Sequence, residues 1–156
     1  MVAYGIKKPS LKTDAEVQAH AAKTFDYSDE ILRIESFTGE EEFPLGVNSL
    51  PTVRILDGGE VYELASDCTG DIGEFLKTID LEGNLVKTGT YNDSLWNNQL
   101  RPIVNEDFVA PEGKTVAIFY ASYLGKLNKD STKGWLDSRS SNPELEFVLI
   151  NCDIAN

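Results

Sequence analysis

The 156-residue sequence predicts an α/β protein with a mixed sheet and flanking helices. Apolar residues recur at helical spacing through residues 14–25, which predicts an amphipathic helix. Apolar and polar residues alternate on both sides of Asp57-Gly58-Gly59, which predicts an antiparallel hairpin. Residues 114–122 and 146–152 are continuously apolar in their centres, as is typical of strands buried on both faces of a parallel sheet. Parallel and antiparallel pairing are therefore both expected.

Composition excludes two classes of partner. The chain has 14 Lys and Arg against 26 Asp and Glu, a net charge of −12. Nucleic-acid binding needs a basic face that displaces phosphate counterions, so we expect no nucleic-acid partner. No stretch approaches the ~20 apolar residues of a membrane span, so we expect no membrane insertion. The 41% hydrophobic content is enough to form a core.

The first elements run from residue 1 to residue 36. Met1–Tyr4 is expected to form a short strand, and Thr13 with Glu16 forms the capping box of a helix over 14–25. His20 lies in this helix, where we interpret it as a surface or packing residue rather than a catalyst. Residues 30–36 form the next predicted strand. One face of the helix carries its apolar side chains, Val17, Ala21 and Phe25.

The hairpin of residues 52–65 is followed by a second helix, which begins at Thr69 or Asp71. Its apolar residues share one face and must pack on the sheet. They are Ile72, Phe75, Leu76 and Ile79.

Residues 81–99 differ in composition from the segments around them, because they contain several Gly and Asn residues. We interpret them as a linker in which Trp96 packs locally. A short strand is expected at 101–105 and a helix at about 127–138, with Trp135 and Leu136 available for packing. With strands 114–122 and 146–152, this helix completes a right-handed βαβ unit. We therefore divide the chain into a first unit (1–80), a linker (81–99) and a partial second unit (100–156). The second unit has an uncovered sheet edge, so either the chain is a fragment or this unit completes a sheet with another element. We favour packing against the first unit or a partner.

Cys68 and Cys152 are the only cysteines, and they form neither a CxxC pair nor a metal-ligand cluster. We interpret them as free, mostly buried thiols, although the sequence leaves a bridge open. We expect no metal and no cofactor. If Met1 is the true start, the location is cytoplasmic; if the chain is processed, it is the endoplasmic reticulum or another organelle lumen.

Three segments resemble the thioredoxin-like family, most closely tandem redox-inactive domains of the protein disulfide isomerase type. In VNSLPTVRILDGGEV, Pro51 occupies the position of the family's cis proline ahead of an antiparallel strand pair. KTVAIFYASYLGKLNK is similar to the opening strand and active-site loop, and ELEFVLINCDIAN to the following strand. The resemblance implies one thioredoxin-like unit lacking its leading strand and helix, plus a partial second unit.

The resemblance places the family's two active-site cysteines at Leu124 and Leu127, within the degenerate loop Tyr123, Leu124, Gly125, Lys126 and Leu127. Leucine has no nucleophilic atom, so we expect no redox enzyme. The implied function is a non-catalytic protein-binding or scaffold module, such as an accessory subunit, whose partner is another protein or a second copy. The implied peptide groove is formed by Leu50, Pro51, Leu124 and Leu127.

Two other functions stay open. A glutathione S-transferase resemblance rests on the DGGEVYEL hairpin, but the expected Glu-Ser pair is broken because Leu64 follows Glu63. A calsequestrin-like calcium-binding role rests on acidity, and Glu40–Glu42 is the only dense acidic run. The loop at Lys7, Lys8 and Ser10 is interpreted as solvated.

Overall fold

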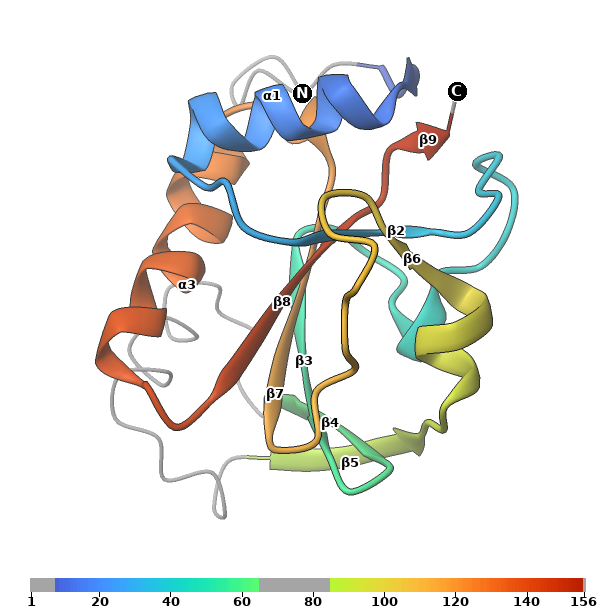
Figure 1. Cartoon of the computed structure of the whole chain (residues 1–156), viewed down its shortest axis with the longest axis vertical. Helices are drawn as coiled ribbons and strands as arrows, with labels where there is room; N and C mark the ends of the chain where they lie inside the picture. Colours follow the sequence, from blue (N-terminus) through green and yellow to red (C-terminus); the bar gives the residue numbers. More distant parts are fainter. Residues whose placement is uncertain (1–7, 65–84, 156) are drawn as a thin grey trace.

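The computed structural model describes residues 8–64 and 85–155. Its centre is a seven-stranded mixed sheet in the order β5-β4-β3-β7-β8-β2-β6, which confirms the α/β class (Figure 1). A two-stranded parallel sheet, β1 (Leu11–Lys12) with β9 (Ile154–Ala155), lies beside it. The strands of the large sheet are β2 (Ile31–Ile34), β3 (Thr52–Asp57), β4 (Glu60–Leu64), β5 (Leu85–Thr90), β6 (Leu100–Pro102), β7 (Thr115–Tyr120) and β8 (Glu146–Asn151).

The neighbouring strands β7, β8 and β2 are parallel. β7 pairs with β8 from Thr115↔Glu146 to Tyr120↔Asn151, and β8 pairs with β2 at Ile31↔Leu149. All six residues of β7 are buried, as its continuous apolar sequence predicts. The other neighbour of β7 is β3, which runs antiparallel to it and makes the sheet mixed.

The predicted hairpin is confirmed as β3 and β4, which pair antiparallel around Gly58 and Gly59. Both glycines have positive φ, 59° and 88°, the backbone that a two-residue hairpin turn requires. β5 then pairs antiparallel with β4, so the interpretation of residues 85–90 as linker was wrong. This edge strand pairs through its backbone, and its largely exposed side chains show no apolar alternation.

Helix α1 (Asp14–Phe25) begins at the predicted capping box. The Thr13 hydroxyl accepts from the Glu16 N–H, and the Glu16 carboxylate accepts from the Thr13 N–H. Such a cap contributes about 1 kcal/mol. The three predicted apolar residues of the helix are buried: Val17, Ala21 and Phe25.

The predicted helix after β7 is confirmed as a run of short helical segments. A wide turn, η5 (Asn128–Thr132), continues into α3 (Lys133–Asp137) and ends in η6 (Ser138–Ser141). Trp135 and Leu136 are buried, as expected from their apolar character. Together with β7 and β8, these segments form the expected β-helix-β connection.

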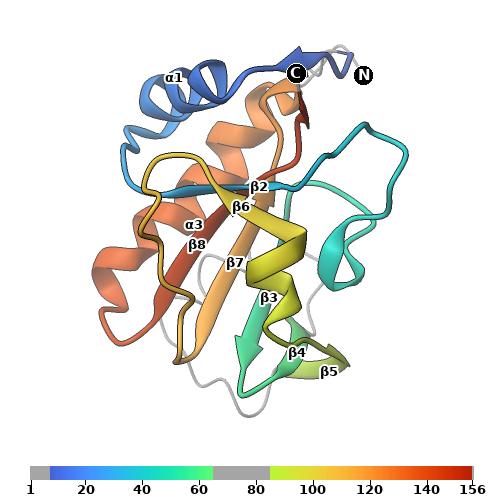
Figure 2. The same ribbon diagram turned by 45° about the vertical axis from the view of Figure 1, so that its right-hand side comes forward.

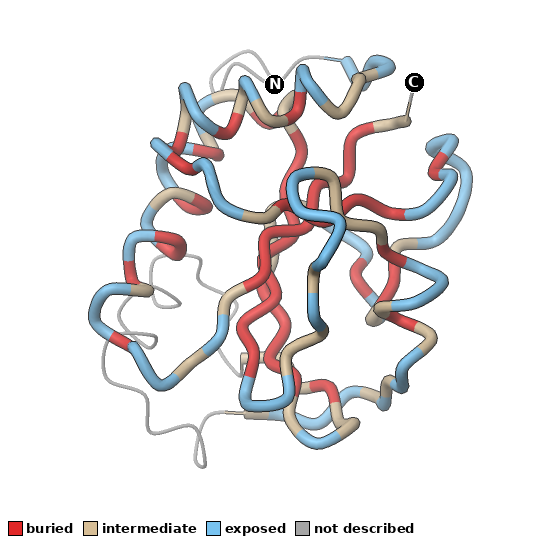
Figure 3. Tube along the Cα trace, in the orientation of Figure 1, coloured by how far each residue is buried: buried red, intermediate tan, exposed pale blue. Residues whose placement is uncertain are grey.

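The two faces of the sheet are covered differently. Helices α1 and α3 lie on one face, while the opposite face is covered by short turns, η2 (Pro44–Gly46) and η3 (Leu95–Gln99), and by loops (Figure 2). Buried residues follow the central strands between these layers (Figure 3). We call the core on the turn-covered side the second cluster; its buried members include Leu56, Val61, Leu95, Phe119, Leu124 and Ile150.

The two predicted units share this sheet. β3 and β4 come from residues 1–80, and β3 pairs directly with β7 from residues 100–156. Strands of the first unit therefore occupy the edge of the second unit that was expected to be open. This is the expected arrangement in which the second unit packs against the first. β6 begins one residue before the predicted strand 101–105 and pairs with β2. The strand predicted at Met1–Tyr4 and the helix predicted after Thr69 or Asp71 lie outside the described residues.

Candidate functional site

The candidate site is the loop that follows β7. Its backbone stays extended at Ala121 and then makes a short helical turn, η4 (Ser122–Leu124). Gly125 follows with φ 60° and ψ −128°, a conformation that is strongly unfavourable for a residue with a Cβ atom. Gly125 therefore ends the η4 turn, and the helical segments follow it.

Buried polar side chains anchor the loop at both ends. The Asp153 carboxylate accepts from the Ser122 N–H at 3.0 Å, from the Ser122 hydroxyl at 2.9 Å and from the Asn151 amide at 2.7 Å. Asp153 is 2% exposed, so these donors replace the water that its charge would otherwise require. At the other end, the Asn128 amide donates to the Ala121 carbonyl at 3.1 Å. These hydrogen bonds join the start of the loop to the segment after β8 and to the helical segments that follow it.

The sheet brings the two parts of the predicted groove together. Thr52 pairs with Phe119, so Leu50 and Pro51 lie next to the start of the loop. The Leu50–Pro51 peptide bond is cis, as the resemblance implied. Leu50, Leu124 and Leu127 all belong to or pack against the second cluster.

Burial changes the interpretation of the groove. Leu124 is only 5% exposed and is a core residue, so it does not present the apolar surface that was expected there. The other three residues of the predicted groove, Leu127, Leu50 and Pro51, are partly buried and remain accessible. Of the other loop residues, Tyr123 and Gly125 are partly buried and Lys126 is exposed.

The loop carries leucine at both positions that the resemblance assigns to the active-site cysteines. The nearby Cys152 is a free thiol that is 1% exposed, and its backbone N–H donates to the Tyr120 carbonyl at 2.7 Å. Burial, and secondarily the Asp153 charge, raise the pKa of the Cys152 thiol well above its usual value. This thiol is therefore protonated and a poor nucleophile at neutral pH. Cys68 lies outside the described residues.

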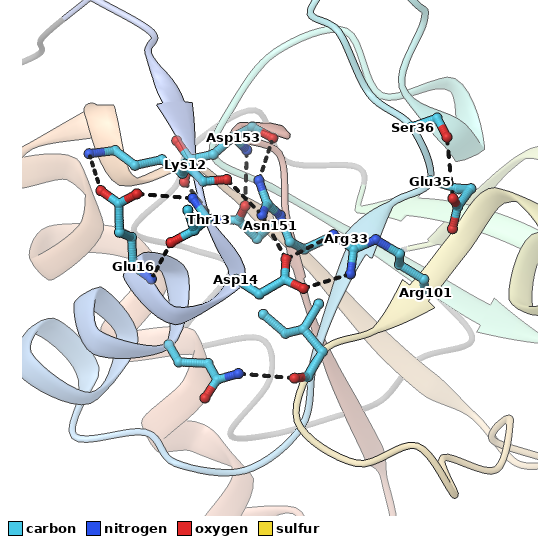
Figure 4. A network of polar contacts seen from close by, with 12 residues as sticks. Lys12, Thr13, Asp14, Glu16, Arg33, Glu35, Ser36, Arg101, Asn151 and Asp153 are labelled. Carbon is cyan, nitrogen blue, oxygen red and sulfur yellow. Dashed lines mark hydrogen bonds and ion pairs between the residues drawn. The ribbon is translucent and has the colours of Figure 1, made fainter. Parts of the chain in front are cut away.

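Next to the loop lies an ionic network that sequence reasoning missed (Figure 4). Arg33 is 1% exposed; it donates to the Asp14 carboxylate at 2.9 Å and to the Lys12 carbonyl at 3.0 Å. It also donates to the carbonyls of Asp153 and Ile154, at 3.2 and 3.3 Å. The guanidinium thus ties β2, the start of α1 and the segment after β8 together.

Asp14 is shared by two arginines. Arg101 donates to both of its carboxylate oxygens, at 2.8 and 2.9 Å, and Arg33 adds a third contact. These partners, Arg101 foremost, lower the pKa of Asp14 to about 2. The sequence did offer one sign that this arginine is buried, because Arg33 is the single charged residue in the otherwise apolar strand ILRI. Its partners could not be assigned until the fold was known.

His20 packs against two aromatic rings in this arrangement. Its ring lies edge-on to Phe25 at 5.8 Å and stacks on Tyr120 at 6.2 Å. Burial is the main cause that lowers the His20 pKa. The Tyr120 hydroxyl has no hydrogen-bond partner among the described residues, and burial raises its pKa.

Within residues 8–64 and 85–155, no three His, Cys, Asp or Glu side chains gather as a metal-ligand set. No helix in the same part of the chain is long and apolar enough to cross a membrane. Comparison with protein-family models, with curated proteins and with solved structures gave no match.

Proposed function

We propose that this chain is a redox-inactive, thioredoxin-like module that acts by binding a segment of another protein. The observation that carries the proposal is the pairing of Thr52 with Phe119, which places the proline-headed hairpin beside the degenerate loop. In the thioredoxin-like family, as the resemblance implies it, these two parts belong to one substrate-binding site. Here they come from opposite halves of the chain.

The strand order supports a single module in permuted order. In the family the opening strand-helix-strand unit precedes the proline-headed hairpin. Here β7, the helical segments and β8 correspond to the opening unit, and β3 and β4 to the hairpin, which comes first in the chain. They are neighbours in the sheet, in the order β4-β3-β7-β8. Each half therefore supplies what the other lacks.

The backbone at Leu50 supports peptide binding. In the family, the residue before the cis proline pairs through its backbone with an extended peptide. No backbone hydrogen bond joins Leu50 to another described residue, and its side chain is partly exposed beside the second cluster. An extended segment with an apolar side chain fits this position, because main-chain pairing gives affinity and the apolar neighbourhood gives selectivity.

Peptide binding is tested by selecting ligands from a phage-displayed peptide library and measuring them by fluorescence anisotropy. Leu50→Asp should weaken the selected peptides about tenfold or more, because it places a charge beside the apolar side chain of the peptide. Val109→Asp is the matched control, since Val109 is 79% exposed and is not part of the groove. Equal loss of binding in both variants would contradict the proposal.

The shape of the loop is tested by restoring the dithiol. The double variant Leu124→Cys/Leu127→Cys should gain measurable reduction of insulin disulfides, whereas each single variant should not turn over. Because position 124 is buried, the new thiol should have a raised pKa, so the activity should increase with pH. A folded double variant without activity would show that the loop does not have the thioredoxin geometry.

A further inference from the structure

A polar hollow of about 440 Å³ opens between β4, β5 and the turns that cover the second cluster. Val61 and Leu95 line it and are each 2% exposed, so its floor belongs to the core. Around this floor stand polar side chains, including Glu63, Thr88, Tyr91 and Gln99. A hollow of this size, with an apolar base and a few polar groups, is typical of ligand sites.

An irregularity in the sheet shapes one wall. The register between β4 and β5 shifts from Val61↔Gly89 to Tyr62↔Lys87, so Thr88 has no partner on β4. Such a bulge redirects side chains and interrupts pairing locally. Thr88 is exposed at this bulge and lines the hollow.

Arg54 does not line the hollow itself but holds three residues that do, Leu45, Gly46 and Glu63. Its Nε donates to the Leu45 carbonyl, and a terminal nitrogen donates to the Gly46 carbonyl, both at 3.3 Å. The same nitrogen lies 2.7 Å from a carboxylate oxygen of Glu63, while the other donates to Thr52 and Val53. Every guanidinium nitrogen is therefore taken by a protein oxygen. Arg54 offers no free donor to an anionic ligand.

The remaining polar groups favour a positive charge. Glu63 is the one charged side chain among the described residues that line the hollow, and it is 43% exposed. Its Oε1 lies 2.7 Å from a terminal nitrogen of Arg54, and the exposed part of the carboxylate can also accept from a ligand. Tyr91 adds an aromatic ring, held edge-on to Trp96 at 6.5 Å, and aromatic faces attract cations. The net charge of −12 attracts cations at longer range.

We infer that this hollow binds a cationic group, an ammonium or guanidinium, through Glu63 and the polar groups around it. The group has two sources, a free small amine or a basic side chain of a protein partner. The inference does not require the loop after β7 to bind peptide, so each proposal can fail without the other.

The test is an NMR titration in which each probe is added to the ¹⁵N-labelled protein and binding is monitored through the amide chemical shifts. The probes are n-butylammonium as a free amine and N-acetyl-arginine amide as a basic side chain, with n-butanol and butyrate as neutral and anionic controls. Both cations should shift the amides of residues 88–92, and the controls should not. Tighter binding of the arginine probe identifies a partner side chain as the source, and equal or tighter binding of n-butylammonium identifies a free amine.

A matched pair of variants tests the position of the charge. Thr88→Lys adds a positive charge to the wall and should weaken binding of both cations about tenfold, because like charges placed together repel. Val86→Lys makes the same change of net charge on the same strand, at a residue that is 52% exposed and does not line the hollow, and should leave binding nearly unchanged. The inference is overturned if butyrate shifts the same amides, if both variants weaken binding equally, or if neither cation shifts them.

Discussion

The buried guanidinium of Arg33 allows a quantitative test of the network around Asp14. Arg33→Met keeps an apolar stem of similar length but removes all four of its hydrogen bonds, to Asp14 and to the carbonyls of Lys12, Asp153 and Ile154. Removing one partner of a buried ion pair lowers the free energy of unfolding by about 3–5 kcal/mol, because the other charge is left without its partner. With a slope of about 2 kcal/mol per molar urea, the unfolding midpoint should fall by roughly 2 M.

The matched variant is Arg101→Met. Arg101 binds the same carboxylate, but its side chain is 32% exposed, and exposed ion pairs contribute only about 0–1 kcal/mol. Urea unfolding at neutral pH, monitored by tryptophan fluorescence, measures the free energy of unfolding of both variants. The conclusion that Arg33 stabilises this network more than Arg101 does would be refuted if Arg101→Met were as destabilising as Arg33→Met.

Three further predictions concern stability. The Asp14 pKa is lowered to about 2 in the folded state, so its contribution is present above pH ~4 and is lost as the pH falls toward 2. After allowance for its partial exposure, the stability difference between the wild type and Asp14→Asn should therefore shrink by about 1 kcal/mol over that range, as urea melts at each pH would show. Thr13→Ala removes the cap of α1 and should cost about 1 kcal/mol, whereas Thr38→Ala, which breaks an exposed loop contact to Glu41, should cost less. Trp135→Ala empties a site that is 1% exposed and should cost about 3–5 kcal/mol in thermal or urea unfolding; a loss below 1 kcal/mol would contradict its place in the core.

Local features of the fold could be predicted from the sequence. The capping box at Thr13 and the apolar stripe of α1 depend on residues within one helix, so their pattern is visible in the chain. The hairpin was predictable because Gly58 and Gly59 mark its turn, and β7 because every residue on both of its faces is buried. In each case the physical cause lies within a few residues.

Nonlocal features could not be predicted in the same way. The pairing of β3 with β7 joins residues more than fifty positions apart, and no local pattern encodes it. β5 was missed because an edge strand with exposed side chains has no apolar periodicity. Arg33 and Asp153 were missed because a buried charge resembles a surface charge in the sequence until its partners are known. The burial of Leu124 was missed because it depends on the whole second cluster.

The position of β7 has a consequence for biosynthesis. This strand lies between β3 and β8, yet β2, β3 and β4 all precede it in the chain and leave the ribosome earlier. The hairpin therefore emerges with one apolar strand edge exposed, and β2 emerges before its neighbour β8 exists. Exposed strand edges invite aggregation, and long-range pairing slows folding. The nascent chain should consequently depend on protection by chaperones until its last strands are synthesised.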